Sequence, residues 1–479
     1  MILKIISIDD LADYTKLSNI ISSNYLPLNL IELFAESLSK SVRSVAVEYP
    51  YVDKDYRSTY YNFYSKRHRT YDKFCFRIHL FEEWFDSKDN LNDVRESYLG
   101  SIVLRPTEVA TLGRTQLSPM AIRNFSGYIC ESGFQNNLMG VPLDVKCFPH
   151  IMQDTDVTVC AHAVCWMVAR YYSKKYAIYP ERLSFDIAES TKDFSEGRII
   201  PSRGLTMGQI SEILAAIGFY PEIFIRELYE DQSLFYDMLY SYVESGIPVV
   251  AAMGKKRHAV AVIGHGPMRS VVQVIKTLDD NLVSARHFID HLIINDDNNL
   301  PYNSMKFDVN DAENNSVYNL DDVDGFVVPL FEKMYLSAEN VLKLYQRIFH
   351  GKLLNLPVKH EKCVVRVYMT SSRSYKRKIR ESTLINRLMQ LAQLELPMPK
   401  FIWIVEIASP SNYDKKMTDY RWIIDATANQ YEIYPFLLIH DHKKMYINDR
   451  ALKRQLFRIF FDTQVQPYEL YENNLRRYE

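Results

Sequence analysis

The chain has little of several features, and each shortage excludes a class of protein. It contains no apolar run of about 18 residues or more, so we expect no membrane-spanning helix. Its six cysteines stand at irregular spacings, which argues against a disulfide framework and favours reduced thiols. Its first residues lack the basic start and the long apolar stretch of a signal peptide. We therefore expect a cytoplasmic protein without membrane attachment.

An excess of charge of one sign is missing as well. The chain has 57 basic and 59 acidic residues, and this near balance argues against a nucleic-acid partner. Two basic segments stand out locally. Lys66–Arg69 lies among tyrosines, a pattern found in single-strand binders, but a charged hairpin tip is the favoured interpretation. Five cations crowd the start of a predicted helix, where the helix dipole disfavours them: Arg373, Lys376, Arg377, Lys378 and Arg380. An anionic partner would compensate them, although a solvated face is the favoured alternative.

The length of 479 residues exceeds what one hydrophobic core serves, so we expect several domains. Periodicity predicts an α+β chain: an N-terminal accessory α/β domain over residues 1–140, a catalytic domain over 141–335, and a C-terminal accessory α+β domain over 336–479. The predicted helices are Leu28–Ser39, Cys160–Tyr172, Gly204–Gly218, Phe235–Glu244 and Ser374–Leu394. The predicted strands of the middle domain are Val249–Met253, His258–Gly264, Val271–Ile275 and His291–Ile294.

The middle domain contains the residue types of a nucleophilic thiol site. Cys160 begins a helix, where the positive end of the helix dipole favours a thiolate. His258 opens an apolar strand, so its imidazole can face a cleft and hold the thiol proton. Asp296 and Asp297 follow another apolar strand and provide a group to orient the imidazole. The pattern predicts Cys160 and His258 as catalytic residues.

Other assignments of these residues are weaker. Cys165 lies further into the helix, where the apolar pattern favours a core residue over a nucleophile. A zinc site at Cys160, His162 and Cys165 lacks a matching second pair of ligands, so we expect no metal. His265 has the opposite parity to His258 along the strand and points to the other face of the sheet.

Two of these segments resemble the papain-like cysteine peptidases. His258–Gly264, with the sequence HAVAVIG, is similar to the histidine strand of that family. Cys160–Tyr172 is similar to the nucleophile helix of the bacteriocin-processing branch, in which the cysteine begins the helix and a Tyr-Tyr pair ends it. The resemblance covers roughly residues 141–305. Ala161 stands where relatives usually carry Gly. Gln153 precedes Cys160 by seven residues, one more than the usual spacing of the oxyanion-hole glutamine.

The resemblance implies a papain-like core with a helical lobe and an antiparallel sheet lobe. It also implies roles for individual residues. Its orienting residue comes directly after a strand, which favours Asp296 over Asp297. Asp425 lies in a stretch faintly similar to transglutaminases but lacks a histidine to pair with, so we interpret it as structural. Cys160, His258 and Asp296 would form a triad, with Gln153 as an oxyanion donor and no cofactor.

The expected function is hydrolysis of a peptide or isopeptide bond in a protein or peptide substrate. A transglutaminase-like acyl transferase and an inactive papain-fold binding module stay open as alternatives. Large accessory domains often restrain an intracellular protease, so a regulated effector with a protein partner on these domains is one interpretation.

Overall fold

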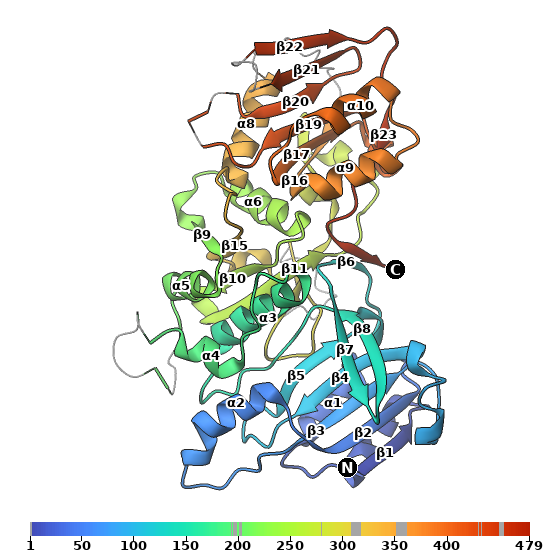
Figure 1. Ribbon diagram of the computed structural model, residues 1–479, viewed down its shortest axis with the longest axis vertical. Coiled ribbons are helices and arrows are strands. Elements are labelled where there is room, and N and C mark those ends of the chain that lie inside the picture. Colours follow the sequence, from blue (N-terminus) through green and yellow to red (C-terminus); the bar gives the residue numbers. More distant parts are fainter. Residues whose placement is uncertain are drawn as a thin grey trace.

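The computed structural model describes the chain except residues 1, 193, 195–198, 201–203, 279, 308–317, 351–361, 430, 433 and 450–454. Three large sheets follow one another along the long axis of the described part, and helices pack around them (Figure 1). Most strand pairs are antiparallel, and most helices lie outside direct strand–helix–strand alternation, so the predicted α+β class is confirmed. No helix of the described residues has both the length and the apolar character needed to cross a bilayer.

The N-terminal sheet has five antiparallel strands in chain order. They are β1 (Ile2–Ser7), β2 (Ser44–Tyr51), β3 (Cys75–Phe81), β4 (Tyr98–Leu104) and β5 (Leu112–Leu117). Helix α1 (Leu28–Ser37) buries Leu30, Ile31 and Phe34 against it, on the side that its helical apolar spacing predicts. Helix α2 (Lys54–Asn62) and the hairpin of β7 (Ser132–Leu138) and β8 (Val141–Cys147) lie between this sheet and the middle of the molecule (Figure 1).

The middle of the molecule combines a helical part with an antiparallel sheet. Its helices are α3 (Cys160–Lys175), α4 (Ser184–Glu189), α5 (Met207–Ile217) and α6 (Gln232–Glu244). The strands, in spatial order, are β14 (Asn303–Lys306), β13 (His291–Asn295), β11 (His258–His265), β10 (Val249–Met253), β15 (Gly325–Leu330) and β9 (Tyr220–Ile225). Helix α3 is buried from Ala161 to Tyr172 and packs on β11, so the two elements that carry Cys160 and His258 lie in direct contact.

The ends of helix α5 follow the rules for helix caps. Thr206 accepts the N–H of Gln209 as N-cap, and Gly218 ends the helix in the left-handed conformation with φ 112°.

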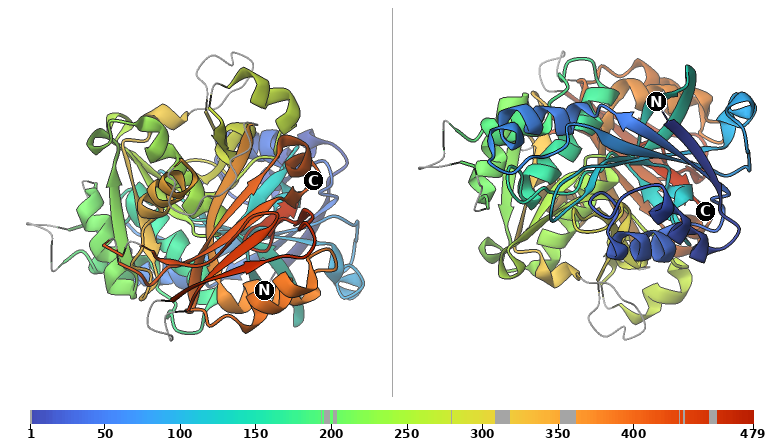
Figure 2. Two further views of the ribbon diagram at one scale, coloured as in Figure 1. Left: turned by 90° about the horizontal axis from the view of Figure 1, so that it is seen from above. Right: turned by 90° about the horizontal axis from the view of Figure 1, so that it is seen from below.

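The C-terminal sheet has seven strands in the spatial order β12, β16, β17, β19, β20, β21 and β22. Their bounds are β12 (Leu282–Ser284), β16 (Cys363–Ser371), β17 (Phe401–Ala408), β19 (Tyr420–Asp425), β20 (Phe436–His440), β21 (Lys444–Asp449) and β22 (Gln455–Phe460). Alternate residues of β17 enter two cores: Ile402 and Ile404 share a core with residues of α9 (Ser372–Glu381) and α10 (Arg387–Glu395), whereas Trp403 and Val405 join the central core. The two helices, in orange, lie along one side of the C-terminal strands in the view from above (Figure 2). Helix α8 (Ala338–His350) packs against the central core.

Several short elements tie the three sheets together. Strand β6 (Gly127–Ile129) pairs with β11, and β24 (Arg476–Tyr478) pairs with β6, so the last described strand joins the middle sheet. Strand β12 pairs in parallel with β16 of the C-terminal sheet. Helix α11 (Pro410–Asp414) precedes a small pair of strands, β18 (Met417–Thr418) and β23 (Tyr468–Glu469). Strands of one unit that pair in the sheet of another therefore join the three units into one body.

Two element predictions are wrong. Val271–Ile275, predicted as a strand, begins with the short helix α7 (Val271–Val274). The Asp414 carboxylate accepts the N–H groups of Val271 and Val272, a contact far along the chain that β-branched residues cannot reveal. The single helix predicted over Ser374–Leu394 is two helices, α9 and α10, because the Asn386 side chain caps a new helix.

Candidate active site

Cys160 is the first residue of α3 and the most accessible of the six cysteines. It is half-buried, whereas the other five are buried. Cys165, the alternative nucleophile, is fully buried, and this burial raises the pKa of its thiol to about 12. The structure therefore leaves Cys160 open to a reactant and encloses Cys165 in the core.

His258 opens β11 beside this helix start. Its Nε2 lies 2.8 Å from Oδ1 of Asp296, and its imidazole is in hydrogen-bonding contact with the Cys160 thiol. The preceding residue, Arg257, has φ 51° in a tight turn that aims the strand start at the helix. The structure thus brings together the three residues predicted as the triad, from three separate elements.

Asp296 follows β13 directly and is buried. Its Oδ1 accepts the backbone N–H of Asn298 at 3.1 Å, and its Oδ2 accepts the Asn299 amide at 2.7 Å. Burial alone would raise the pKa of this carboxyl, but hydrogen bonds from His258 and the two asparagines hold it below its usual value. Asp296 is therefore ionised where it meets the imidazole.

The pKa of His258 is the strongest electrostatic feature of the site. Burial alone would lower it, but the hydrogen bonds with Asp296 and Cys160 and the charges of Asp296 and Asp297 raise it to about 10. The imidazole is accordingly protonated at neutral pH. An imidazolium beside a sulfur atom at a helix start stabilises negative charge on that sulfur.

Tyr318 covers His258 and was not predicted from the sequence. The two rings stack with centroids 5.5 Å apart and an interplanar angle of 26°, and the Tyr318 hydroxyl is hydrogen-bonded with Asp296. The Lys256 ammonium lies 4.9 Å from the centroid of the tyrosine ring. A lone tyrosine in a polar segment gives no sequence signal for such a contact.

Gln153 reaches the edge of the site. Its Nε2 donates to Oδ1 of Asn298 at 3.4 Å, and Asn298 in turn lies 3.5 Å from Nε2 of His258. The loop that carries it is closed by Asp154, whose Oδ1 accepts the N–H groups of Val157 and Thr158, each at 2.8 Å. This turn accommodates the extra residue between Gln153 and Cys160.

The N-terminal unit contacts both the Gln153 loop and helix α3. Arg105, a buried residue after β4, donates to the carbonyl oxygens of Met152 at 3.0 Å and Gln153 at 3.4 Å. Asp55 of α2 accepts the Trp166 indole N–H at 2.8 Å, and it forms an ion pair with Arg170 at 3.0 Å. These contacts join residues far apart in sequence, so no local pattern predicts them.

One group of side chains in the described residues has the spacing of a metal site. Atoms of His258, Asp296 and Asp297 lie within 4.8 Å of one another. Asp297 is fully buried, neither carboxylate oxygen has a well-formed hydrogen bond, and burial raises its pKa to about 7. A cation here would have to displace Asp296 from its bonds with His258 and Asn299, so the arrangement serves the imidazole better than a metal.

The remaining candidates have structural contacts. His265 binds Glu244 through Nε2 at 2.9 Å and its neighbour's carbonyl through Nδ1 at 2.7 Å. Asp425 ends β19 and accepts the N–H of Thr427 at 2.8 Å. His162 accepts the N–H of Val159 at 3.3 Å in the first turn of α3.

Comparison with models of protein families, with curated proteins and with solved structures finds no match.

Proposed function

We propose that the protein is a cysteine hydrolase of papain-like design that cleaves a peptide or isopeptide bond. The proposal rests on one observation: three side chains of suitable chemistry lie together. They are the half-buried Cys160 at the start of a helix, His258 at the start of a strand, and the buried, ionised Asp296. In papain-like enzymes a helical lobe provides the thiol and a sheet lobe provides the histidine. The helical part and the antiparallel sheet of this protein provide Cys160 and His258 in the same way.

In the first half of the reaction, the Cys160 sulfur attacks the carbonyl carbon and forms a carbon–sulfur bond. The carbonyl oxygen takes the negative charge. His258 gives its proton to the leaving amine as the carbon–nitrogen bond breaks, and a thioester remains. Asp296 holds Nε2, which leaves Nδ1 for this proton transfer.

In the second half, neutral His258 takes a proton from water as the water oxygen attacks the thioester. Collapse of this second tetrahedral intermediate releases the acid and the Cys160 sulfur. The oxyanion of both steps has two candidate donors, the backbone N–H of Cys160 and the Gln153 amide. In the structure the Gln153 amide donates a hydrogen bond to Asn298, and this bond keeps the amide near the His258 imidazole.

The substrate class is tested by comparing new protein N-termini in cells that express the wild-type chain or Cys160→Ala. We expect new N-termini with the wild type alone. Purified protein with water as the only acceptor distinguishes hydrolysis from transfer to an amine. Equal sets of N-termini, together with no thioester in the purified wild type, would favour an inactive binding module.

A further inference from the structure

Two short basic segments border the candidate active site. The first lies in the connection between α2 and β3 and contains Lys66 and Arg67. The second is the turn directly before β11 and contains Lys255, Lys256 and Arg257. All five residues are exposed. We call these five residues the basic rim.

Contacts place the first segment on the Cys160 side of the site. Nη1 of Arg67 lies 3.5 Å from Oδ1 of Asp156, which belongs to the loop that leads to Cys160. The Gln153 amide, at the start of the same loop, reaches the residue that lies beside the His258 imidazole. This loop therefore joins the first segment to the reacting groups.

The second segment lies on the His258 side of the site. Arg257 adjoins His258, and Lys255 stands three residues before it, so the two backbones are at most about 11 Å apart. The Lys256 ammonium lies 4.9 Å from the centroid of the Tyr318 ring, which stacks on the imidazole. The screening length at physiological ionic strength is about 8 Å, so cations in this range contribute to the potential at the site.

Acidic residues pair with two of the five cations. Arg67 has Asp156 as its partner, and Lys256 pairs with Asp322 at 2.8 Å. A further acid beside the second segment, Asp324, is already bound by an arginine at 3.2 Å and by a backbone N–H at 2.6 Å. The nearby carboxylates are therefore all in use.

The other three cations of the basic rim are unpaired. Within the part of the chain that the structure describes, no ion pair is formed by Lys66, Lys255 or Arg257. Inside the site, the negative charge of Asp296 is balanced by the protonated imidazole of His258. The surroundings of the thiol thus carry an excess of positive charge, although the whole chain has a formal net charge of −2.

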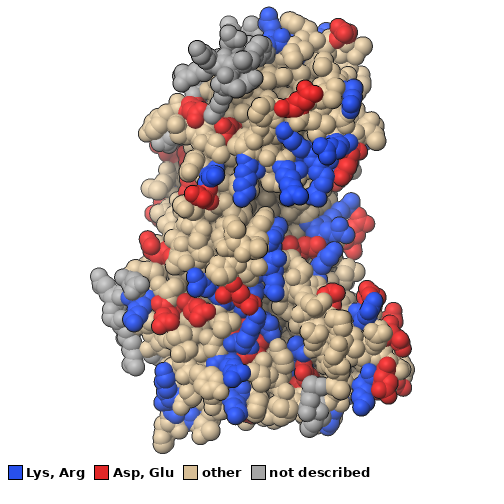
Figure 3. All heavy atoms as spheres, in the orientation of Figure 1, with Lys and Arg blue, Asp and Glu red and all other residues tan. Residues whose placement is uncertain are grey.

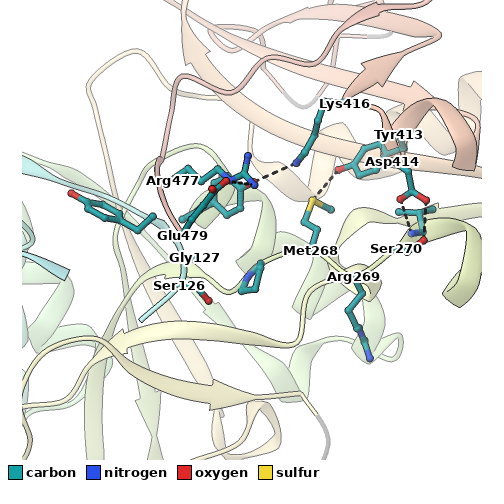
Figure 4. A pocket seen from close by; sticks show the side chains of 14 residues that line it. Ser126, Gly127, Met268, Arg269, Ser270, Tyr413, Asp414, Lys416, Arg477 and Glu479 are labelled. Carbon is teal, nitrogen blue, oxygen red and sulfur yellow. Dashed lines mark hydrogen bonds and ion pairs between the residues drawn. The ribbon is translucent and has the colours of Figure 1, made fainter. Parts of the chain in front are cut away.

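Other basic places on the molecule differ from the basic rim. Both signs mix over most of the face in Figure 3, except where Lys and Arg gather over α9 in the C-terminal unit. A cavity of about 560 Å³ beside β6, α11 and β24 also contains cations (Figure 4). There each cation has an acidic partner: Arg269 with Asp290 at 2.9 Å, Lys416 with Glu472 at 3.2 Å, and Arg477 with Glu479 at 2.5 Å. The basic rim combines unpaired cations with a reactive thiol.

We infer that the substrate of this site is an acidic peptide segment, with Asp or Glu on both sides of the bond that is cleaved. The inference rests on the proposed function and names its substrate class. Cations on the Cys160 side and on the His258 side attract such a segment and hold it across the sulfur, and a potential of this kind raises association rates by about 10- to 1,000-fold. The exposed pairs of Arg67 and Lys256 are worth little, so these two cations can exchange their partners for a carboxylate of the substrate.

The first test measures the potential at Cys160 without turnover. Iodoacetate and iodoacetamide alkylate a thiolate by the same displacement of iodide, but only iodoacetate is an anion. The ratio of their rates at Cys160, followed by mass spectrometry, reports the local charge. Replacing Lys255 and Arg257 together with methionine should lower this ratio about threefold or more, while the iodoacetamide rate changes less than about twofold.

The matched control is the same double change at Lys88 and Arg95. These two residues are exposed and follow the end of β3, whereas the first segment of the basic rim precedes its start. The control should leave the ratio unchanged. Melting temperatures check that both double variants are folded. Raising the salt concentration from about 0.05 M to about 0.5 M should lower the wild-type ratio as well.

The second test uses two peptides of equal length with a chloroacetyl group on the central residue. One carries Asp and Glu on both sides of this residue, and the other carries Asn and Gln. We expect the acidic peptide to label Cys160 about tenfold faster at physiological salt. Lys66→Met should reduce this preference, and so should the double change at Lys255 and Arg257, because the two segments contact different halves of the peptide.

Equal labelling by the two peptides overturns the inference, and so does an iodoacetate ratio that is the same in the rim variant and its control. Failure of the proposed function looks different, because the preference for the acidic peptide would persist while cells show no new N-termini. Where new N-termini do appear, acidic residues should flank the cleaved bonds. Cleavage sites without such residues would also overturn the inference.

Discussion

The N-terminal and C-terminal units contact the middle of the molecule in different places, and the difference separates the proposed catalysis from stability. The N-terminal unit contacts the candidate active site, through Arg105 on the Gln153 loop and Asp55 on helix α3. It also pairs the backbone of Thr115 with that of His150, just before this loop. The N-terminal unit therefore fixes the positions of the loop and the helix that carry Gln153 and Cys160.

The C-terminal unit contacts the opposite side through a buried chain of charges. Arg366 of β16 binds Glu244 of α6 at 2.8 Å and Glu406 of β17 at 2.9 Å, and Arg421 of β19 binds Glu406 at 2.9 Å. All four residues are buried. None of them contacts the triad. The C-terminal unit is thus expected to set stability and to leave the chemistry of the site alone.

The largest expected effect is on stability, at the centre of the charge chain. Arg366→Met leaves Glu244 and Glu406 buried without their shared cation, which should lower the free energy of unfolding by about 3–5 kcal/mol. Chemical denaturation measures this loss. Arg380→Met, on exposed α9, is the control and should change it by less than about 0.5 kcal/mol. A large loss of turnover in folded Arg366→Met would contradict the separation of roles.

The next effect is on rate. Arg105→Met frees the carbonyl oxygens of Met152 and Gln153, so the loop that carries the oxyanion donor loses its fixed position. We expect a fall of about 100-fold in kcat with little change in KM, once a substrate is known. Arg43→Met, an exposed change in the same unit, should be silent. If both variants turn over substrate at the wild-type rate, the N-terminal unit does not contribute to the proposed catalysis.

A smaller effect concerns pH. Asp296→Asn removes the charge that raises the pKa of His258 to about 10, so that pKa should fall. The imidazolium, and the rate that depends on it, is present below this pKa and is lost as the pH rises through it. The alkaline limb of the kcat/KM profile should therefore move to lower pH in Asp296→Asn. An unmoved limb would assign it to another group.

The smallest effect concerns Asp297. Burial raises its pKa to about 7, well above the unfolded value of about 4, so ionisation of the native protein costs stability as the pH rises through this window. Asp297→Asn should raise the melting temperature at pH 8 relative to wild type and change it little at pH 4. Thermal melts at both values check this. A lower melting temperature at pH 8 would show that the ionised carboxylate stabilises the fold.

Sequence patterns indicate the candidate site residues better than they indicate the residues that hold them in position. Cys160 and His258 each lie at the boundary of an element with strong periodicity, so local pattern alone indicates them. Local pattern indicates Asp296 and Asp297 equally, and only the family resemblance favoured Asp296. Tyr318, Arg105 and Asp55 act through contacts far along the chain, which no local pattern encodes. The α7 error has the same cause, because Asp414 stabilises a helix in a segment that favours a strand.

The most direct test of the central claim is the rate at which iodoacetamide alkylates Cys160 near pH 6.5, followed by mass spectrometry in wild type and His258→Ala. Removal of the imidazole opens space beside the thiol, so a slower reaction in His258→Ala would be due to loss of the imidazolium and not to shielding of the sulfur. We predict that Cys160 reacts at least tenfold faster in the wild type, with the buried cysteines slow in both proteins. Equal rates at Cys160 would contradict the account, because His258 would then do nothing for the sulfur that it contacts.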